Sequence, residues 1–142
     1  MDRVRLRKSG PRQFVGIDSK QHTLTVDIQP EFGGESAGLK PSDLLPLSLG
    51  SCIGVTAVGI LQKMRQGPFE LNVDIDFDHE PDPPKKFTKF NITWHFRGEN
   101  LDQDKLLKAI TTAEHKYCSV SATLKDDIEV NHTLTVEEVA VA

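Results

Sequence analysis

The chain has two cysteines, Cys52 and Cys118, whose thiols are the side chains best suited to covalent chemistry. They lie far apart in the sequence, so only tertiary packing can bring them together. In the cytoplasm, where structural disulfides are uncommon, such cysteines are buried apolar side chains, metal ligands or redox-active thiols. Because free cysteine is often buried, two unrelated buried thiols are the alternative to a shared site.

A metal site is the least favoured of these alternatives. His115 and Cys118 have the i, i+3 spacing of two ligands at a helix end, and Cys52 is a conceivable third ligand. However, no CxxC or HExxH pattern accompanies them. We therefore predict no metal and no cofactor. The remaining histidines are predicted to lie at the surface: His22, His79, His95 and His132.

Composition and charge limit the function further. The 142 residues carry 17 Lys and Arg against 21 Asp and Glu, a net charge of −4, which argues against a nucleic-acid coat or a membrane-surface binder. Seven Phe and one Trp can fill one core, so we expect a single domain over residues 1–142. The basic N-terminus lacks the apolar region of a secretory signal, and the expected compartment is the cytoplasm.

Cys52 falls in an apolar segment, Leu44–Gln62, that has no charged side chain. We predict a helix that is apolar on all sides, as a globular core or a dimer interface requires, with Ser42 as N-cap and Asp43 near the positive helix end. A membrane span of this length is disfavoured because glycine, proline and hydroxyl residues dilute its hydrophobicity. Small residues at Gly50, Gly54 and Ala57 form one stripe, which predicts close approach of a second helix.

The elements around this helix follow from hydrophobic periodicity. Period-two alternation predicts strands, and helical spacing predicts an amphipathic helix that ends just before Cys118. The first three strands are expected to form an antiparallel meander, and the next two an antiparallel pair. The strand segments are Val4–Arg7, Gln13–Ile17, Thr23–Ile28, Leu71–Asp78, Phe90–Phe96 and Ile128–Val136, and the amphipathic helix is Leu101–Tyr117.

The surroundings of both cysteines resemble the OsmC/Ohr family of organic hydroperoxide reductases and their OsmC-like relatives. The run Pro41-Ser42-Asp43-Leu44-Leu45 before the Cys52 helix is similar to the family's Pro-x-acidic-Leu-Leu segment. Cys118-Ser119-Val120-Ser121 is similar to its second signature, Cys-Pro-Val-Ser. Gly33-Gly34 and the strand opening at Phe87 also fit, so the resemblance covers most of the chain.

This resemblance implies an α+β fold in which antiparallel sheets surround a central apolar helix carrying Cys52 and a second helix ends at Cys118. It also implies an intertwined homodimer with active sites at the subunit interface. Cys52 would attack an organic hydroperoxide, Cys118 would resolve the sulfenic acid as a disulfide, and an external dithiol would reduce it.

The family chemistry also implies an arginine that lowers the pKa of the reactive cysteine, held by a carboxylate. The first candidate for the arginine is Arg12, from its distance ahead of Gly33-Gly34, followed by Arg7 and Arg5. The family glutamate ten positions before the first cysteine is replaced here by Ser42, and Asp43 is the candidate carboxylate. The rival hypothesis is a non-catalytic dimeric protein that binds a small hydrophobic ligand at the subunit interface.

Overall fold

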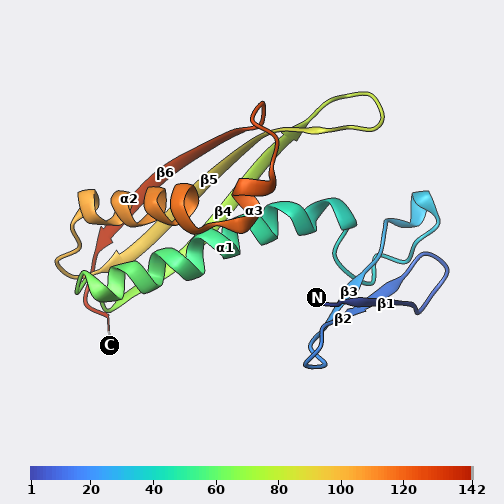
Figure 1. The fold of residues 1–142 in the computed structure, drawn as a ribbon, viewed down its shortest axis with the longest axis horizontal. Coiled ribbons are helices and arrows are strands. Elements are labelled where there is room, and N and C mark those ends of the chain that lie inside the picture. The colour runs from blue at the N-terminus through green and yellow to red at the C-terminus, as the bar shows by residue number, and fades with distance from the viewer. Residues whose placement is uncertain (142) are drawn as a thin grey trace. The chain divides into compact units, whose positions relative to one another are not determined.

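A computed structural model describes residues 1–141, which divide into two compact units, residues 1–45 and the described residues from 46 onward. The elements follow the chain order drawn in Figure 1. The elements are β1 (Arg5–Lys8), β2 (Phe14–Ile17), β3 (Thr23–Val26), the 3₁₀-helix η1 (Pro30–Phe32), α1 (Pro41–Lys63), β4 (Phe69–His79), β5 (Phe87–Gly98), α2 (Gln103–Thr112), the π-helix η2 (Ala113–Tyr117), α3 (Ser119–Thr123) and β6 (Glu129–Glu138).

The first unit contains a three-stranded antiparallel meander in the order β1-β2-β3, as the sequence predicts. Beyond β3 the chain is held by the buried side chain of Asp27. Its Oδ1 accepts a hydrogen bond from the backbone N–H of Ile28 at 2.8 Å, and its Oδ2 accepts from Glu35 and Ala37, both at 3.1 Å. Alternation places Asp27 on the polar side of its strand, but this carboxylate anchors the following loop instead.

The second unit is built on a three-stranded sheet in the order β4-β5-β6. β4 and β5 are antiparallel, as predicted, whereas β6 pairs with β5 in parallel, so this sheet is mixed. The apolar residues that alternate along one face of β5 are fully buried: Phe90, Ile92, Trp94 and Phe96. α1 and α2 cover that face (Figure 1) and contribute Leu49, Ile53 and Ile110 to the same core.

α1 begins at Pro41, not after Ser42, so the prediction of Ser42 as N-cap is wrong. Proline suits the first helical position because its fixed φ matches a helix and its missing N–H has no helical partner there. Pro46 lies inside the helix. Leu49, Ile53, Ala57 and Leu61 are buried, although length and composition alone would let α1 cross a bilayer.

The small-residue stripe of α1 meets the sheet rather than a second helix of this chain. A Cβ added at Gly50 would overlap Cδ1 of Ile75 on β4. A Cβ at Gly54 would lie 3.6 Å from Cζ3 of Trp94 on β5. Glycine at these positions therefore lets the helix backbone approach the sheet closely, because the large side chains come from the strands.

The predicted amphipathic helix is divided into two parts. α2 is capped by Asp102, whose side chain accepts from the backbone N–H groups of Asp104 and Lys105. The last turn, Ala113–Tyr117, is a π-helix, and the chain leaves it at Cys118. A short helix, α3, follows and was not predicted.

Candidate functional site

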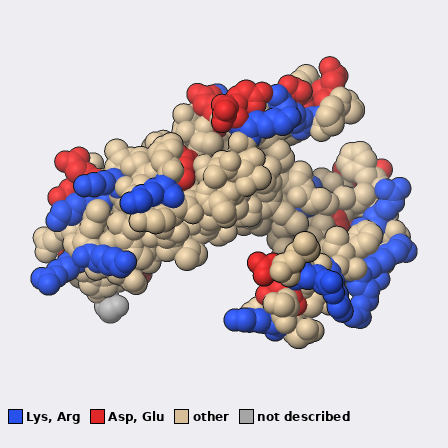
Figure 2. Space-filling model, in the orientation of Figure 1, with Lys and Arg blue, Asp and Glu red and all other residues tan. Residues whose placement is uncertain are grey.

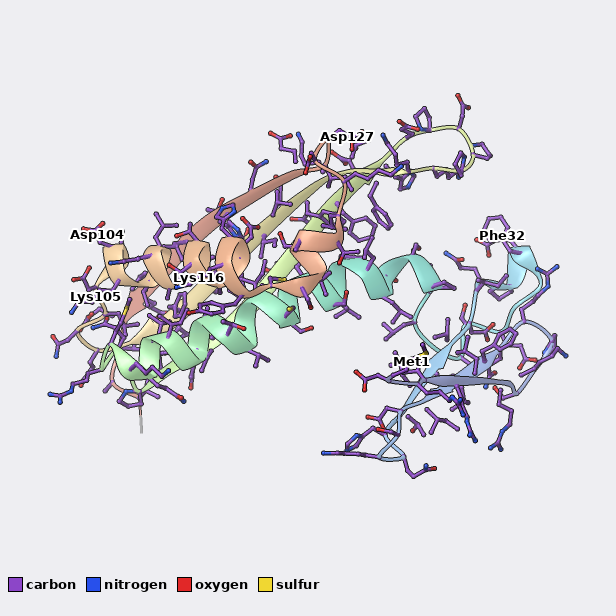
Figure 3. All side chains as sticks on the ribbon, in the orientation of Figure 1. Met1, Phe32, Asp104, Lys105, Lys116 and Asp127 are labelled. Carbon is purple, nitrogen blue, oxygen red and sulfur yellow. The ribbon has the colours of Figure 1, made fainter. Side chains whose placement is uncertain are left out.

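Cys52 and Cys118 meet within the second unit. Cys52 lies on α1 and is half-buried, and Cys118 is buried, with 2% of its surface exposed. The Cys118 thiol lies close enough to Cys52 to lower the pKa of Cys52 as a hydrogen-bond donor to its sulfur. Figure 3 draws the side chains of α1, which carries Cys52, and of α3, which follows Cys118. The two thiols are therefore not unrelated buried side chains.

Cys118 is positioned by its place between η2 and α3. It has extended backbone dihedral angles and is the N-cap of α3, and its Sγ accepts a hydrogen bond from the backbone N–H of Ser121 at 3.2 Å. The backbone N–H of Ser119 lowers the pKa of Cys52 as a donor, and that of Val120 acts on both thiols. The residues after Cys118 thus supply donors to both sulfur atoms.

The environment separates the acidities of the two thiols. Hydrogen bonding from Cys118 is the largest cause that lowers the pKa of Cys52, and burial opposes it. The backbone N–H groups of Val120 and Ser119 and the Ser119 hydroxyl lower this pKa further. Burial raises the pKa of Cys118, and the hydrogen bond to Cys52 and the charge of its thiolate raise it further. Cys52 is consequently the better thiolate and Cys118 the better donor.

Ser119 is a functional candidate that the sequence reasoning did not single out. The family signature has proline at this position, and proline has neither a backbone N–H nor a hydroxyl group. Serine supplies both donors to Cys52. The departure from Cys-Pro-Val-Ser was a signal that could have identified it.

The two other candidate residues, Arg12 and Asp43, belong to the first unit. The Arg12 side chain lies against Gly33, where a Cβ would be 3.7 Å from its Nε. Asp43 forms an ion pair with Lys40 at 3.9 Å. Within residues 1–141, the structure pairs Asp43 with Lys40 and not with Arg12.

The histidines differ from the sequence prediction at one position. His132 is not at the surface: 8% of its side chain is exposed, and it lies between Trp94 and Glu114. His115 is exposed. No group of three or more His, Cys, Asp or Glu side chains in residues 1–141 is arranged to hold a metal ion.

The OsmC family model, described as OsmC-like protein, matches residues 33–133, a span that includes both cysteines. The chain belongs to the OsmC-like family. Protein YhfA of Escherichia coli K12 is 26% identical over 125 residues, which cover 87% of this chain and 89% of YhfA. Membership of this family supports a redox or stress-related role.

Solved structures of similar proteins share the α+β fold. A hypothetical protein from Aquifex aeolicus VF5 has a TM-score of 0.84 and 27% identity, with 98% of each chain covered. The organic hydroperoxide resistance protein OsmC from Legionella pneumophila has a TM-score of 0.65 and 16% identity, with 96% of this chain and 97% of that chain covered.

Proposed function

We propose that this OsmC-like protein is a thiol-dependent peroxidase that reduces organic hydroperoxides to alcohols. The observation that carries the proposal is the pairing of two cysteines from distant segments, in which Cys118 lowers the pKa of Cys52 while burial raises the pKa of Cys118. A thiolate is the nucleophile in peroxide cleavage, and a neighbouring neutral thiol is the group needed to resolve the product. The name of the Legionella pneumophila relative is consistent with this chemistry.

In the first step the Cys52 thiolate attacks the terminal oxygen of the hydroperoxide. The S–O bond forms, the O–O bond breaks, and the leaving alkoxide takes a proton from solvent and departs as the alcohol. Cys52 is oxidised to the sulfenic acid by two electrons, and the peroxide is reduced by the same two. The donors from Cys118, Ser119 and Val120 favour the ionised form of Cys52 before the attack.

In the second step Cys118 forms the disulfide. Its thiolate attacks the Cys52 sulfur, the S–O bond breaks, and hydroxide leaves as water after taking up the Cys118 proton. Oxidation removes the negative charge of Cys52, so the effect of that charge on the Cys118 pKa disappears and Cys118 ionises more readily. An external dithiol then reduces the disulfide by thiol exchange and is itself oxidised.

Arg12 and Asp43 enter the proposal as the arginine and carboxylate that the family resemblance implies. Asp43→Asn and Arg12→Ala are expected to raise the pKa of Cys52, which alkylation rates against pH would measure. Unchanged profiles in both variants would remove these residues from the site. The donors of residues 118–120 would then be sufficient to ionise Cys52.

The proposed assembly is a homodimer, as OsmC/Ohr proteins often are. α1 leaves apolar side chains exposed, among them Leu47 and Val55, with 76% of Val55 accessible. Figure 2 shows a largely uncharged surface on this side of the second unit. A second copy of the chain would bury these side chains. Sedimentation equilibrium would test the dimer, and a monomer at all concentrations would contradict it.

The decisive experiment follows consumption of cumene hydroperoxide by dithiothreitol-reduced protein. We expect Cys52→Ser to abolish consumption. Cys118→Ser should retain one reduction per chain and accumulate a sulfenic acid that a 1,3-dione traps. Oxidised wild type should contain a Cys52–Cys118 disulfide by mass spectrometry.

Thr111→Ala provides the matched control, because the Thr111 hydroxyl bonds only to carbonyl groups of its own helix, at Leu107 and Lys108. It should consume hydroperoxide at the wild-type rate. Equal consumption by wild type and Cys52→Ser would exclude the peroxidase proposal.

A second candidate function is binding of a small hydrophobic ligand without catalysis. The observation in its favour is an apolar groove of about 550 Å³ within the second unit. The groove is lined by α1 and β4, with Val55 and Val58 on one side and Leu71 and Val73 on the other. Its size and lining suit an alkyl group or a fatty acyl chain.

Titration with a fluorescent fatty acid would separate the two functions. Ligand binding predicts saturable uptake that Val58→Asp abolishes and Cys52→Ser leaves intact. Hydroperoxide consumption without saturable uptake would support the peroxidase alone. If Val58→Asp instead changes only the sedimentation behaviour, the groove belongs to the contact between two copies.

A further inference from the structure

The core of the second unit contains a hydrogen-bonded chain of three side chains on three elements. Trp94 on β5 donates from Nε1 to Nδ1 of His132 on β6 at 3.0 Å. Nε2 of His132 lies 3.0 Å from Oε2 of Glu114 on η2. Trp94 is fully buried, and the Glu114 and His132 side chains are 5% and 8% exposed.

The geometry fixes the proton positions along this chain. An indole N–H can only donate, so Nδ1 of His132 must accept and its ring proton lies on Nε2. That proton is donated to the Glu114 carboxyl group. The other carboxyl oxygen of Glu114 lies 3.1 Å from Nε2 of the exposed His115. Each polar atom in the chain therefore has a partner, which a buried network requires.

One end of the network lies just before Cys118. Glu114 belongs to the π-helical turn Ala113–Tyr117, and the residue after that turn is Cys118. π-helical turns are uncommon and recur at functional sites. Because Glu114 is tied to β6 through His132, the turn from which Cys118 and its donors emerge is anchored to the sheet.

The other end of the network lies against the helix that carries Cys52. The Trp94 ring packs on the α1 backbone at Gly54, where a Cβ would lie 3.6 Å from Cζ3. Gly54 is two residues beyond Cys52. The indole is therefore held by one hydrogen bond and by its contact with α1, and the same three side chains link both cysteine-bearing segments.

We propose that Glu114, His132 and Trp94 are positioning residues that hold Cys118 and the donors of Ser119 and Val120 in register with Cys52. The inference rests on the thiol chemistry proposed above. In residues 46–141, the groups that hydrogen-bond the two sulfurs come from the cysteines and from Ser119–Ser121, so the three residues act through the backbone they anchor. A loosened anchor separates the two thiols without removing either.

The test measures the Cys52–Cys118 disulfide against reduced and oxidised glutathione, with no peroxide present. The equilibrium consumes one oxidised glutathione, forms the protein disulfide and releases two reduced glutathiones. Its constant reports how closely the thiols are held. Glu114→Ala should lower this constant about tenfold or more, because small displacements of paired groups strongly reduce their effective concentration. It should also raise the pH at which Cys52 is alkylated.

Two further variants separate positioning from simple stability. Glu114→Gln keeps an oxygen that accepts from Nε2 of His132, so it should stay close to wild type. Phe69→Leu weakens the edge contact between Phe69 and Phe96, whose ring centroids are 5.2 Å apart, and lies outside the network. It should lower the unfolding temperature and leave the glutathione equilibrium unchanged.

The outcomes decide the proposal. Equal constants for wild type and Glu114→Ala, or equal losses in Glu114→Ala and Phe69→Leu, would overturn it. If Glu114→Ala does not fold, His132→Leu, which breaks the hydrogen bonds of His132 to Glu114 and to Trp94, takes its place. Failure of both to fold would assign the network to stability alone and overturn the positioning role.

The same measurements keep this inference distinct from the proposed function. A wild type that forms the disulfide with glutathione, responds to Glu114→Ala and consumes no hydroperoxide would refute the peroxidase and leave the positioning role supported. If the protein is an active peroxidase and Glu114→Ala has the same glutathione equilibrium constant as wild type, only the positioning role is refuted.

Discussion

The Cys118 thiol donates a hydrogen bond to Cys52, and this contact is the largest cause of the lowered pKa of Cys52. Cys118 is itself buried, which raises its own pKa. One contact thus distinguishes the roles of two chemically identical side chains. The pair favours ionisation of Cys52 over that of Cys118, the order of acidities that a two-cysteine redox cycle requires.

The donor in this contact can be tested by two substitutions at one position. Cys118→Ser keeps a hydroxyl that donates to Cys52, whereas Cys118→Ala removes the donor. We expect Cys118→Ala to raise the pKa of Cys52, so that iodoacetamide alkylation requires a higher pH, and Cys118→Ser to stay near wild type. Identical alkylation profiles for the two variants would show that the hydrogen bond has no effect on the thiolate.

The hydroxyl and the backbone N–H of Ser119 should each lower the pKa of Cys52, and substitutions can remove them separately. Ser119→Ala removes the hydroxyl donor, and Ser119→Pro removes the hydroxyl and the backbone N–H together. Because both groups lower the pKa of Cys52, alkylation at neutral pH should slow in the order wild type, Ser119→Ala, Ser119→Pro. Thr111→Ala, on α2, is the control and should keep the wild-type rate. A reversed order would exclude this role.

Replacing each of two glycines of α1 by alanine should change the free energy of unfolding in opposite directions. Gly59 has no atom within 4 Å of an added Cβ, so Gly59→Ala should stabilise the fold by up to about 1 kcal/mol through helix propensity. At Gly50 the added Cβ overlaps Ile75, and overpacking costs about 1–3 kcal/mol. Gly50→Ala should therefore be less stable than Gly59→Ala in urea unfolding.

Shortening Ile75 should restore part of the stability that Gly50→Ala loses. Ile75→Val removes the Cδ1 atom that the new methyl group would meet. In the double variant Gly50→Ala/Ile75→Val, the loss in unfolding free energy should therefore be smaller than the sum of the two single losses. Strict additivity would show that Ile75 does not limit the approach of α1 to β4.

The ionised Asp27 carboxylate should stabilise the fold to an extent that depends on pH. The backbone N–H of Ala37, with those of Ile28 and Glu35, holds the pKa of Asp27 below its ordinary value. A lowered folded-state pKa means that this stabilisation is complete above the unfolded value of about 3.9 and is lost as the pH falls through the folded pKa. Asp27→Asn should lower the urea midpoint at pH 7, and the difference should shrink below about pH 4.

Glu31→Gln is the control for this experiment, since Glu31 is an exposed acid in the same unit. Its midpoint should follow that of wild type at every pH. A difference between wild type and Asp27→Asn that stays constant down to pH 2 would mean that the ionised carboxylate is not what holds the loop.

Local sequence patterns were sufficient for most elements of this fold. Alternation in β4 and β5 predicted two antiparallel strands, and the uncharged stretch around Cys52 predicted the apolar helix α1, which is buried on one side and exposed at Leu47 and Val55. These predictions succeeded because side-chain direction repeats every two residues in a strand and every 3.6 in a helix, whatever the partner. The parallel pairing of β6 had no such signal, because alternation does not encode strand direction.

What the sequence by itself determined is therefore the set of elements, the apolar character of α1 and, through two cysteine motifs, the resemblance to a redox family. Tertiary structure alone decided that Cys118 donates to Cys52, that Ser119 supplies two further donors, and that His132 and Asp27 are buried. The physical reason is that acidity and burial depend on neighbours from distant segments, whereas periodicity depends on the chain itself.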